Sequence, residues 1–119
     1  MVVSDHAEMV AKLVKPGIQI LAEMNGMDAH LLHMGVGISG EAGELLDAIK
    51  KRVVYNKPLD RDNVIEELGD LEFYMESLRK SLMITREETL QANMQKLSKR
   101  YQGLKYSDQA AQDRADKVV

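Results

Sequence analysis

Two pairs of acidic side chains stand out because each pair is spaced by about one helical turn. The first pair forms Glu41-x-x-Glu44 and the second forms Glu67-x-x-Asp70. Residues three apart lie on the same face of a helix, so each pair can share one cation without distorting the backbone. Carboxylate oxygens suit hard divalent cations such as Mg²⁺ and Mn²⁺, which also bind phosphate oxygens. The pattern therefore predicts a divalent-metal site built from four carboxylates.

Two other interpretations of these acids have to be weighed. A single Glu-x-x-Glu motif is most often a pair of solvated acids on an amphipathic helix, but two such motifs beside two apolar stripes disfavour that interpretation. A di-iron helical bundle also uses carboxylates, yet its pattern places Glu-x-x-His on two helices. Neither motif here has histidine at the last position, which argues against iron. Asp47 points away from the apolar stripe and is expected to be solvated.

The acids must be carried by two helices whose apolar residues recur every three or four positions. One helix is expected from about residue 28 to residue 54. The next is expected to begin at a cap formed by Asp60 or Asp62 and to reach about residue 83. The apolar stripe of the first comprises Leu31, Met34, Ile38, Ala42, Leu45, Ile49 and Val53. The stripe of the second comprises Val64, Leu68, Leu71, Met75, Leu78 and Leu82.

Helices are also expected on either side of this pair. An N-terminal segment from about residue 5 to residue 24, capped by Ser4 or Asp5, is interrupted by Lys15-Pro16-Gly17, which predicts a kink or two short helices. Thr85 and Glu88 form a capping box for a helix that reaches about residue 101. A polar tail follows it. The buried face of this last helix is expected at Leu90, Met94, Leu97 and Tyr101.

These elements predict an all-α fold, a bundle of four to five helices in one domain over residues 1–119. Residues 1–27 would form an N-terminal helical segment, residues 28–103 the helices that carry the acids, and residues 104–119 the tail. The 119 residues are 45% hydrophobic, with 4% aromatic residues and no tryptophan, which favours a helical core over a β-sandwich. A helical chain this short often completes its burial by oligomerising.

The composition also limits the expected partners and location. The formal net charge is −3, so there is no broad basic field and duplex nucleic acid is not expected as a partner. Cysteine is absent, which excludes disulfides and thiolate metal sites. No apolar run approaches the roughly 20 residues needed to span a bilayer, and the N-terminus has no signal-peptide pattern. A cytoplasmic protein with no membrane partner is expected.

Three segments carry a resemblance to a known family. They are GEAGELLD at residues 40–47, EELGDL at residues 66–71 and NMQKLSKRY at residues 93–101. Together they resemble the MazG-type nucleotide pyrophosphohydrolases, which belong to the all-α NTP pyrophosphatase superfamily. The resemblance spans roughly residues 30–115 and does not extend to the first 25 residues.

The resemblance implies a function as well as a fold. Members of the family cleave standard or modified nucleoside triphosphates between the α and β phosphates, and they form homodimers or homotetramers. By position, Glu41, Glu44, Glu67 and Asp70 would bind Mg²⁺, with Mn²⁺ as an alternative. Glu41 and Glu44 are the candidates for the catalytic group that takes a proton from water. A dUTP-specific enzyme of the same superfamily and a non-catalytic helical dimer that binds nucleotide or protein are the alternatives.

One face of the last expected helix can bind phosphates. Asn93, Lys96 and Arg100 follow one another at spacings of three and four, and an amide with two cations suits phosphate oxygens. The same residues can also be a solvated basic face that offsets the dipole at the C-terminal end of the helix.

Two further side chains are candidates for binding the substrate. Tyr74 lies one turn after Asp70, where it can stack on a base, donate to a phosphate or simply pack in the core. Arg52, near the end of its helix, returns toward the apolar side and can contact a phosphate. Glycines inside a helix cost stability, so a close helix–helix or helix–ligand approach is expected at Gly35, Gly37, Gly40 and Gly43.

Overall fold

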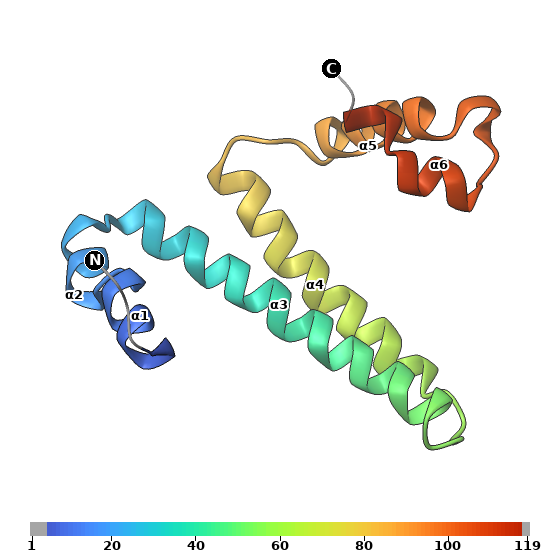
Figure 1. The fold of residues 1–119 in the computed structure, drawn as a ribbon. Coiled ribbons are helices and arrows are strands. Elements are labelled where there is room, and N and C mark those ends of the chain that lie inside the picture. Colours follow the sequence, from blue (N-terminus) through green and yellow to red (C-terminus); the bar gives the residue numbers. More distant parts are fainter. Residues whose placement is uncertain (1–4, 118–119) are drawn as a thin grey trace. The chain divides into compact units, whose positions relative to one another are not determined.

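The computed structural model describes residues 5–117, and every regular element within them is helical (Figure 1). No strand occurs in this range, so the predicted all-α class is confirmed. The chain divides into two units, the first ending at His33 and the second starting at Met34. Among residues 5–117, none of the helices combines the length and the hydrophobicity that a membrane-spanning segment needs. The elements are α1 (His6–Leu13), α2 (Gly17–Glu23), α3 (Gly26–Val53), α4 (Arg61–Ser81), α5 (Arg86–Arg100), the 3₁₀ turn η1 (Gln102–Leu104), α6 (Asp108–Asp113) and the 3₁₀ turn η2 (Ala115–Lys117).

The N-terminal segment forms two short helices instead of one kinked helix. The Asp5 carboxylate caps α1 by accepting a hydrogen bond of 2.8 Å from the backbone N–H of Glu8. Pro16 has extended backbone angles and separates α1 from α2, as expected for a proline that cannot continue a helix. Ser4, the other predicted cap, lies outside the described residues.

Helices α3 and α4 run antiparallel and lie along each other (Figure 1). The Tyr74 ring of α4 lies against the backbone of α3 at Gly37. Further along α3, Ala48 lines the same hollow as Asn63, which belongs to the first turn of α4. Residues later in α3 therefore lie beside residues earlier in α4, as in an antiparallel pair. This antiparallel pairing is what positions the acidic motifs.

The cap of α4 resolves a choice that the sequence leaves open. The carboxylate of Asp60, and not that of Asp62, accepts a hydrogen bond of 3.1 Å from the backbone N–H of Asn63. Replacing Asp60 with Ala is expected to lower the free energy of unfolding by about 1 kcal/mol, because an N-terminal amide of α4 loses its acceptor. Urea denaturation measures this change. Asp62→Ala is the control, since Asp62 contributes only through the helix dipole, and an equal or larger loss in this control would contradict the assignment.

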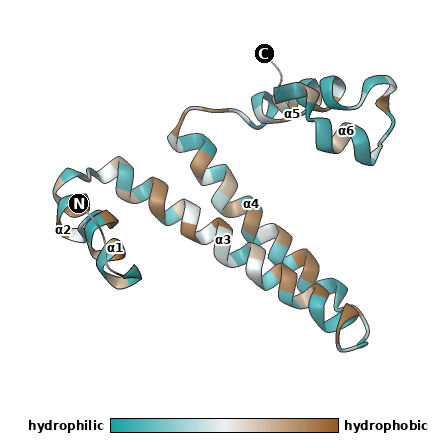
Figure 2. Ribbon diagram, viewed as in Figure 1, coloured by the Kyte–Doolittle hydropathy of each residue, from teal (hydrophilic) through white to brown (hydrophobic). Residues whose placement is uncertain are grey.

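The apolar side chains are only partly buried within the single chain. Met34 and Ala48 are each 4% exposed and are the only buried hydrophobic residues within the described part of the chain. Hydrophobic residues occur along the whole of α3 and α4 (Figure 2). Many of them are exposed to solvent; Val53, for example, is 73% exposed. On α5, the prediction of a buried face is wrong for the single chain at Leu90, Met94 and Leu97, which are exposed, Met94 to 60%. Tyr101, at the end of that face, is half-buried. Apolar surface of this extent is typical of a face that another surface covers.

The segment after α5 folds back on α5 instead of extending as a featureless polar tail. Gly103 has a φ of 75°, a left-handed conformation that glycine adopts readily, and the chain turns there. Ser107 then caps α6. At the end of the segment, Asp116 accepts hydrogen bonds of 2.8 and 3.3 Å from the Arg100 guanidinium, with side chains 4% and 16% exposed. This shielded ion pair holds η2 against α5.

Candidate metal centre

Three of the predicted ligands meet where α3 packs on α4. Glu41, Glu67 and Asp70 each offer a carboxylate oxygen, and these oxygens lie within 4.8 Å of one another. Glu44, which is exposed, lies close enough to Glu41 and Glu67 to influence the pKa of both. The structure therefore brings all four acids into one cluster. Asp47 stays outside it and forms an exposed ion pair further along α3.

The cluster follows from the register of the two antiparallel helices. Tyr74 lies against Gly37. One turn further along α3 and one turn back along α4 lead to Glu41 and Asp70, and the spacing within each motif places the second acid in the next turn. The sequence determines the motifs, whereas the packing of the helices determines which turn of α3 faces which turn of α4.

Close contact and burial raise the pKa of two of these acids. The hydrogen bond with Glu41, reinforced by burial and by the neighbouring carboxylate of Glu44, raises the pKa of Glu67 to about 7. For Glu41 the hydrogen bond with Glu67 lowers the pKa, but burial and the charges of Glu44 and Asp70 outweigh it, so the pKa of Glu41 is also raised. In the metal-free cluster, Glu67 is therefore the acid that holds a proton and donates it to Glu41.

The cluster has the donors that a hard cation requires. Glu67 is only 8% exposed, and the Oε2 atoms of Glu67 and Glu41 are buried without a hydrogen-bond partner among the described residues. No ion pair within residues 5–117 connects a lysine or arginine to any of the four acids. Buried carboxylate oxygens without partners are destabilising. A divalent cation would satisfy them, and an all-oxygen donor set fits Mg²⁺ or Mn²⁺.

The two substrate-binding candidates on α3 and α4 lie at different distances from the acids. Tyr74 is half-buried one turn from Asp70, with one edge of its ring against Gly37 and the Phe73 ring 5.2 Å away in an edge-to-face arrangement. Arg52 lies about two turns beyond Glu44 along α3. Its guanidinium is 3.5 Å from the side-chain oxygen of Asn56. Only Tyr74 therefore adjoins the acid cluster within the described structure.

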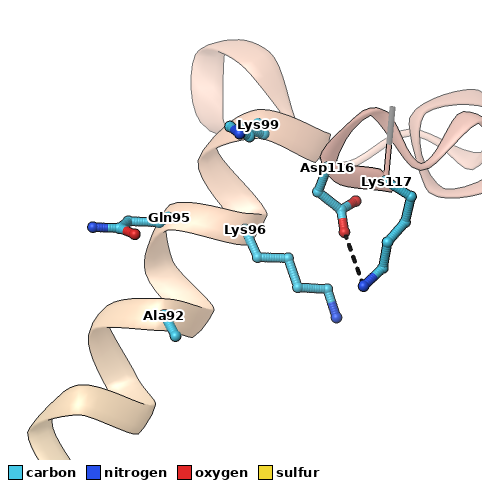
Figure 3. Close-up of a pocket in the computed structure, with 6 residues that line it drawn as sticks. All are labelled: Ala92, Gln95, Lys96, Lys99, Asp116 and Lys117. Carbon is cyan, nitrogen blue, oxygen red and sulfur yellow. Dashed lines mark ion pairs between the residues drawn. The ribbon is translucent and has the colours of Figure 1, made fainter. Parts of the chain in front are cut away.

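A second group of charged side chains surrounds a hollow between α5 and η2 (Figure 3). The hollow has a volume of about 270 Å³, and Lys96, Lys99 and Lys117 line it. Asp116 also lines it; its carboxylate pairs with Arg100 at 2.8 Å and, more loosely, with the Lys117 ammonium at 3.9 Å (Figure 3). Lys96 and Lys117 extend toward the same space (Figure 3). The hollow is thus a concentration of positive charge in a chain whose net charge is −3.

The sequence predicted only part of this basic hollow. The spacing on α5 predicts phosphate binding by Lys96, but no sequence pattern marks Lys99 or Lys117. Arg100, also a phosphate candidate, is occupied by Asp116 in the structure. Asn93 is exposed on α5 and does not line the hollow. Lys117 gave no sequence signal because it reaches the hollow only when the C-terminal segment folds back on α5.

A comparison with protein families agrees with the geometry. A family model described as the MazG nucleotide pyrophosphohydrolase domain matches residues 30–104, which is more than half of the chain. The matched range contains both acidic motifs and α5, and it ends before Asp116 and Lys117. Searches of curated proteins and of solved structures give no match.

Proposed function

The chain belongs to the MazG nucleotide pyrophosphohydrolase family, and we propose that it hydrolyses nucleoside triphosphates to a nucleoside monophosphate and pyrophosphate. The observation that carries this proposal is the cluster of Glu41, Glu67 and Asp70, whose oxygens lie within 4.8 Å of one another. The Oε2 atoms of Glu41 and Glu67 are buried and have no hydrogen-bond partner within the described residues. A cluster of carboxylates that no lysine or arginine side chain neutralises is suited to bind a divalent metal ion, and through that ion a triphosphate.

The four acids of α3 and α4 would hold the cation. When bound, Mg²⁺ or Mn²⁺ would neutralise the charge of the triphosphate and make water more acidic. Glu41 and Glu44 are the two candidates for accepting the proton of the attacking water at a carboxylate oxygen. Glu44 is exposed and open to solvent, whereas Glu41 is half-buried and hydrogen-bonded to Glu67.

We propose that the basic hollow binds phosphate groups of the nucleotide. Lys96, Lys99 and Lys117 provide three ammonium groups, and each can donate charge-assisted hydrogen bonds to phosphate oxygens. Asn93 would add an amide donor from α5. Arg100 can join them only when its ion pair with Asp116 opens, because Asp116 occupies the guanidinium in the structure.

Replacing Lys117 with Ala is expected to raise the KM for the nucleotide about tenfold with little change in kcat. A charge-assisted hydrogen bond contributes roughly 1.5–3 kcal/mol, and an interaction made equally in the ground state and the transition state affects KM alone. Steady-state kinetics measures both constants. Lys105→Ala is the matched control, since Lys105 is exposed and carries the same charge but does not line the hollow. An equal rise in KM for both variants would show that only overall charge matters.

We further propose that the active form is a homodimer or homotetramer. The support is the exposed apolar surface of α3, α4 and α5 described above. An almost entirely apolar hollow adds to it, and its lining includes Ile38, Met75, Leu78 and Leu82. Light scattering coupled to size-exclusion chromatography measures the mass, and a monomer at micromolar concentration would contradict this part of the proposal.

Product analysis tests the proposed reaction. The protein is incubated with each standard dNTP, dUTP and several modified nucleotides in the presence of Mg²⁺, and the products are separated by chromatography. A nucleoside monophosphate with pyrophosphate supports the proposal, whereas a diphosphate with inorganic phosphate contradicts cleavage between the α and β phosphates. Exclusive turnover of dUTP would narrow the substrate class. Inactivity of the wild type, indistinguishable from Glu41→Gln, would favour a non-catalytic binding protein.

A further inference from the structure

Among the glycines of α3, Gly37 is the one that touches the opposite helix. A Cβ atom added to Gly37 would lie 2.6 Å from Cγ of Tyr74 and closer still to Cδ1 and Cε1 of the same ring. Real Cβ atoms do not approach other atoms this closely, so any side chain at this position must displace the ring or move α4. A Cβ added to Gly35, Gly40 or Gly43 would meet nothing within 4 Å. The expected close approach of another helix is therefore confirmed at Gly37, whereas no helix within the described chain approaches Gly35, Gly40 or Gly43.

The contact lies immediately beside the acid cluster. Gly37 precedes Glu41 by four residues on α3, and Tyr74 follows Asp70 by four residues on α4. Both residues of the contact are therefore one turn from the carboxylates. Because the Tyr74 ring packs directly on the backbone of α3 at Gly37, this contact sets the distance between α3 and α4 there. In a closely packed interior, a change in this distance would also displace the side chains one turn away.

We infer that Gly37 is a positioning residue for the metal centre. Its missing side chain lets the Tyr74 ring seat on α3, and the seated ring keeps Glu67 and Asp70 within reach of Glu41. This inference rests on the proposed function, since it assumes that the acids bind a divalent cation. It also gives Tyr74 a role through packing, because the ring edge that lies on Gly37 is not open to a nucleobase.

The helical glycines provide the matched set of variants. Gly37→Ala is compared with Gly35→Ala and Gly43→Ala, which add the same methyl group to the same helix in open space. The measured quantity is the affinity for Mn²⁺ alone, by titration calorimetry, with circular dichroism to verify that each variant is folded at the temperature used. Gly37→Ala is expected to weaken Mn²⁺ binding by about 10- to 100-fold, the range found when groups that orient metal ligands are lost. The two control variants are expected to bind as the wild type does.

A second substitution separates positioning from a general loss of stability. Tyr74→Leu removes the ring that an alanine at position 37 would strike, so the double variant Gly37→Ala/Tyr74→Leu is expected to bind Mn²⁺ as well as Tyr74→Leu alone. Such non-additivity is the mark of two residues in direct contact. The inference is overturned if Gly37→Ala binds Mn²⁺ normally, if the control glycines lose affinity equally, or if the double variant binds Mn²⁺ more weakly than Tyr74→Leu alone.

The test of the role of Gly37 can fail or succeed independently of the test of the proposed reaction. A wild type that binds Mn²⁺ but hydrolyses no nucleotide would contradict the proposed reaction alone, and the series of affinities would still decide the role of Gly37. A wild type that binds no divalent cation would overturn both.

Discussion

Replacing Glu67 with Gln is expected to lower kcat/KM by at least about 100-fold and, at the same time, to raise the thermal stability of the metal-free protein. The loss of activity follows because an amide is a much weaker ligand than a carboxylate, and even groups that only orient metal ligands contribute 10- to 100-fold. The gain in stability follows because Glu67 is 8% exposed among three other acids. A neutral side chain there removes the electrostatic repulsion between Glu67 and the neighbouring carboxylates.

The opposite signs of these two effects make the test specific. Unfolding temperatures in the presence of a chelator measure stability, and steady-state kinetics with Mg²⁺ measures activity. The stability gain should be larger at pH 8, where the wild-type carboxyl is ionised, than at pH 5, where it is protonated. Glu66→Gln is the matched control, because Glu66 is the exposed neighbour and carries the same charge. A Glu67→Gln protein that is less stable at pH 8, or that keeps its activity, would contradict the metal centre.

Local signals in the sequence were sufficient to predict most of the helices. A cap depends on residues three apart, so Asp5 and Thr85 could be recognised directly, and both carboxylate and hydroxyl accept the expected backbone hydrogen bonds. Pro16 likewise predicted an interruption from its own chemistry. The acidic motifs could be placed on helix faces for the same reason, because spacing within one helix is a local property.

Contacts between distant residues could not be predicted in this way. The Gly37–Tyr74 contact depends on the register of two helices, which no single stretch of sequence encodes. The Arg100–Asp116 ion pair joins residues 16 positions apart, and it forms only because the chain turns at Gly103. Periodicity also marks apolar faces without showing what covers them, which is why predicted core positions such as those of α5 are exposed in the single chain.

The affinity for Mg²⁺ is expected to increase about tenfold for each unit by which the pH is raised toward 7, and to be constant above pH 7. A cation requires Glu67 to be ionised, and the metal-free cluster raises the pKa of Glu67 to about 7, chiefly through the hydrogen bond with Glu41. Below that pH each bound cation must displace one proton, so the affinity is inversely proportional to the proton concentration. Calorimetry at pH 6 in buffers of different ionisation enthalpy should show release of about one proton, falling toward zero at pH 8.5.

The same proton governs the stability of the metal-free protein. The folded chain holds it to about pH 7, whereas an unfolded chain releases it near the ordinary pKa of 4.5. Its contribution to folding is therefore complete below pH 4.5 and is lost as the pH rises through 7. Acids whose pKa is lowered, such as Asp116 beside Arg100, act oppositely at low pH, so the effect is isolated as the difference between wild type and Glu67→Gln. A difference in unfolding temperature that does not change between pH 5 and pH 8, or an Mg²⁺ affinity independent of pH, would show that Glu67 is ionised throughout.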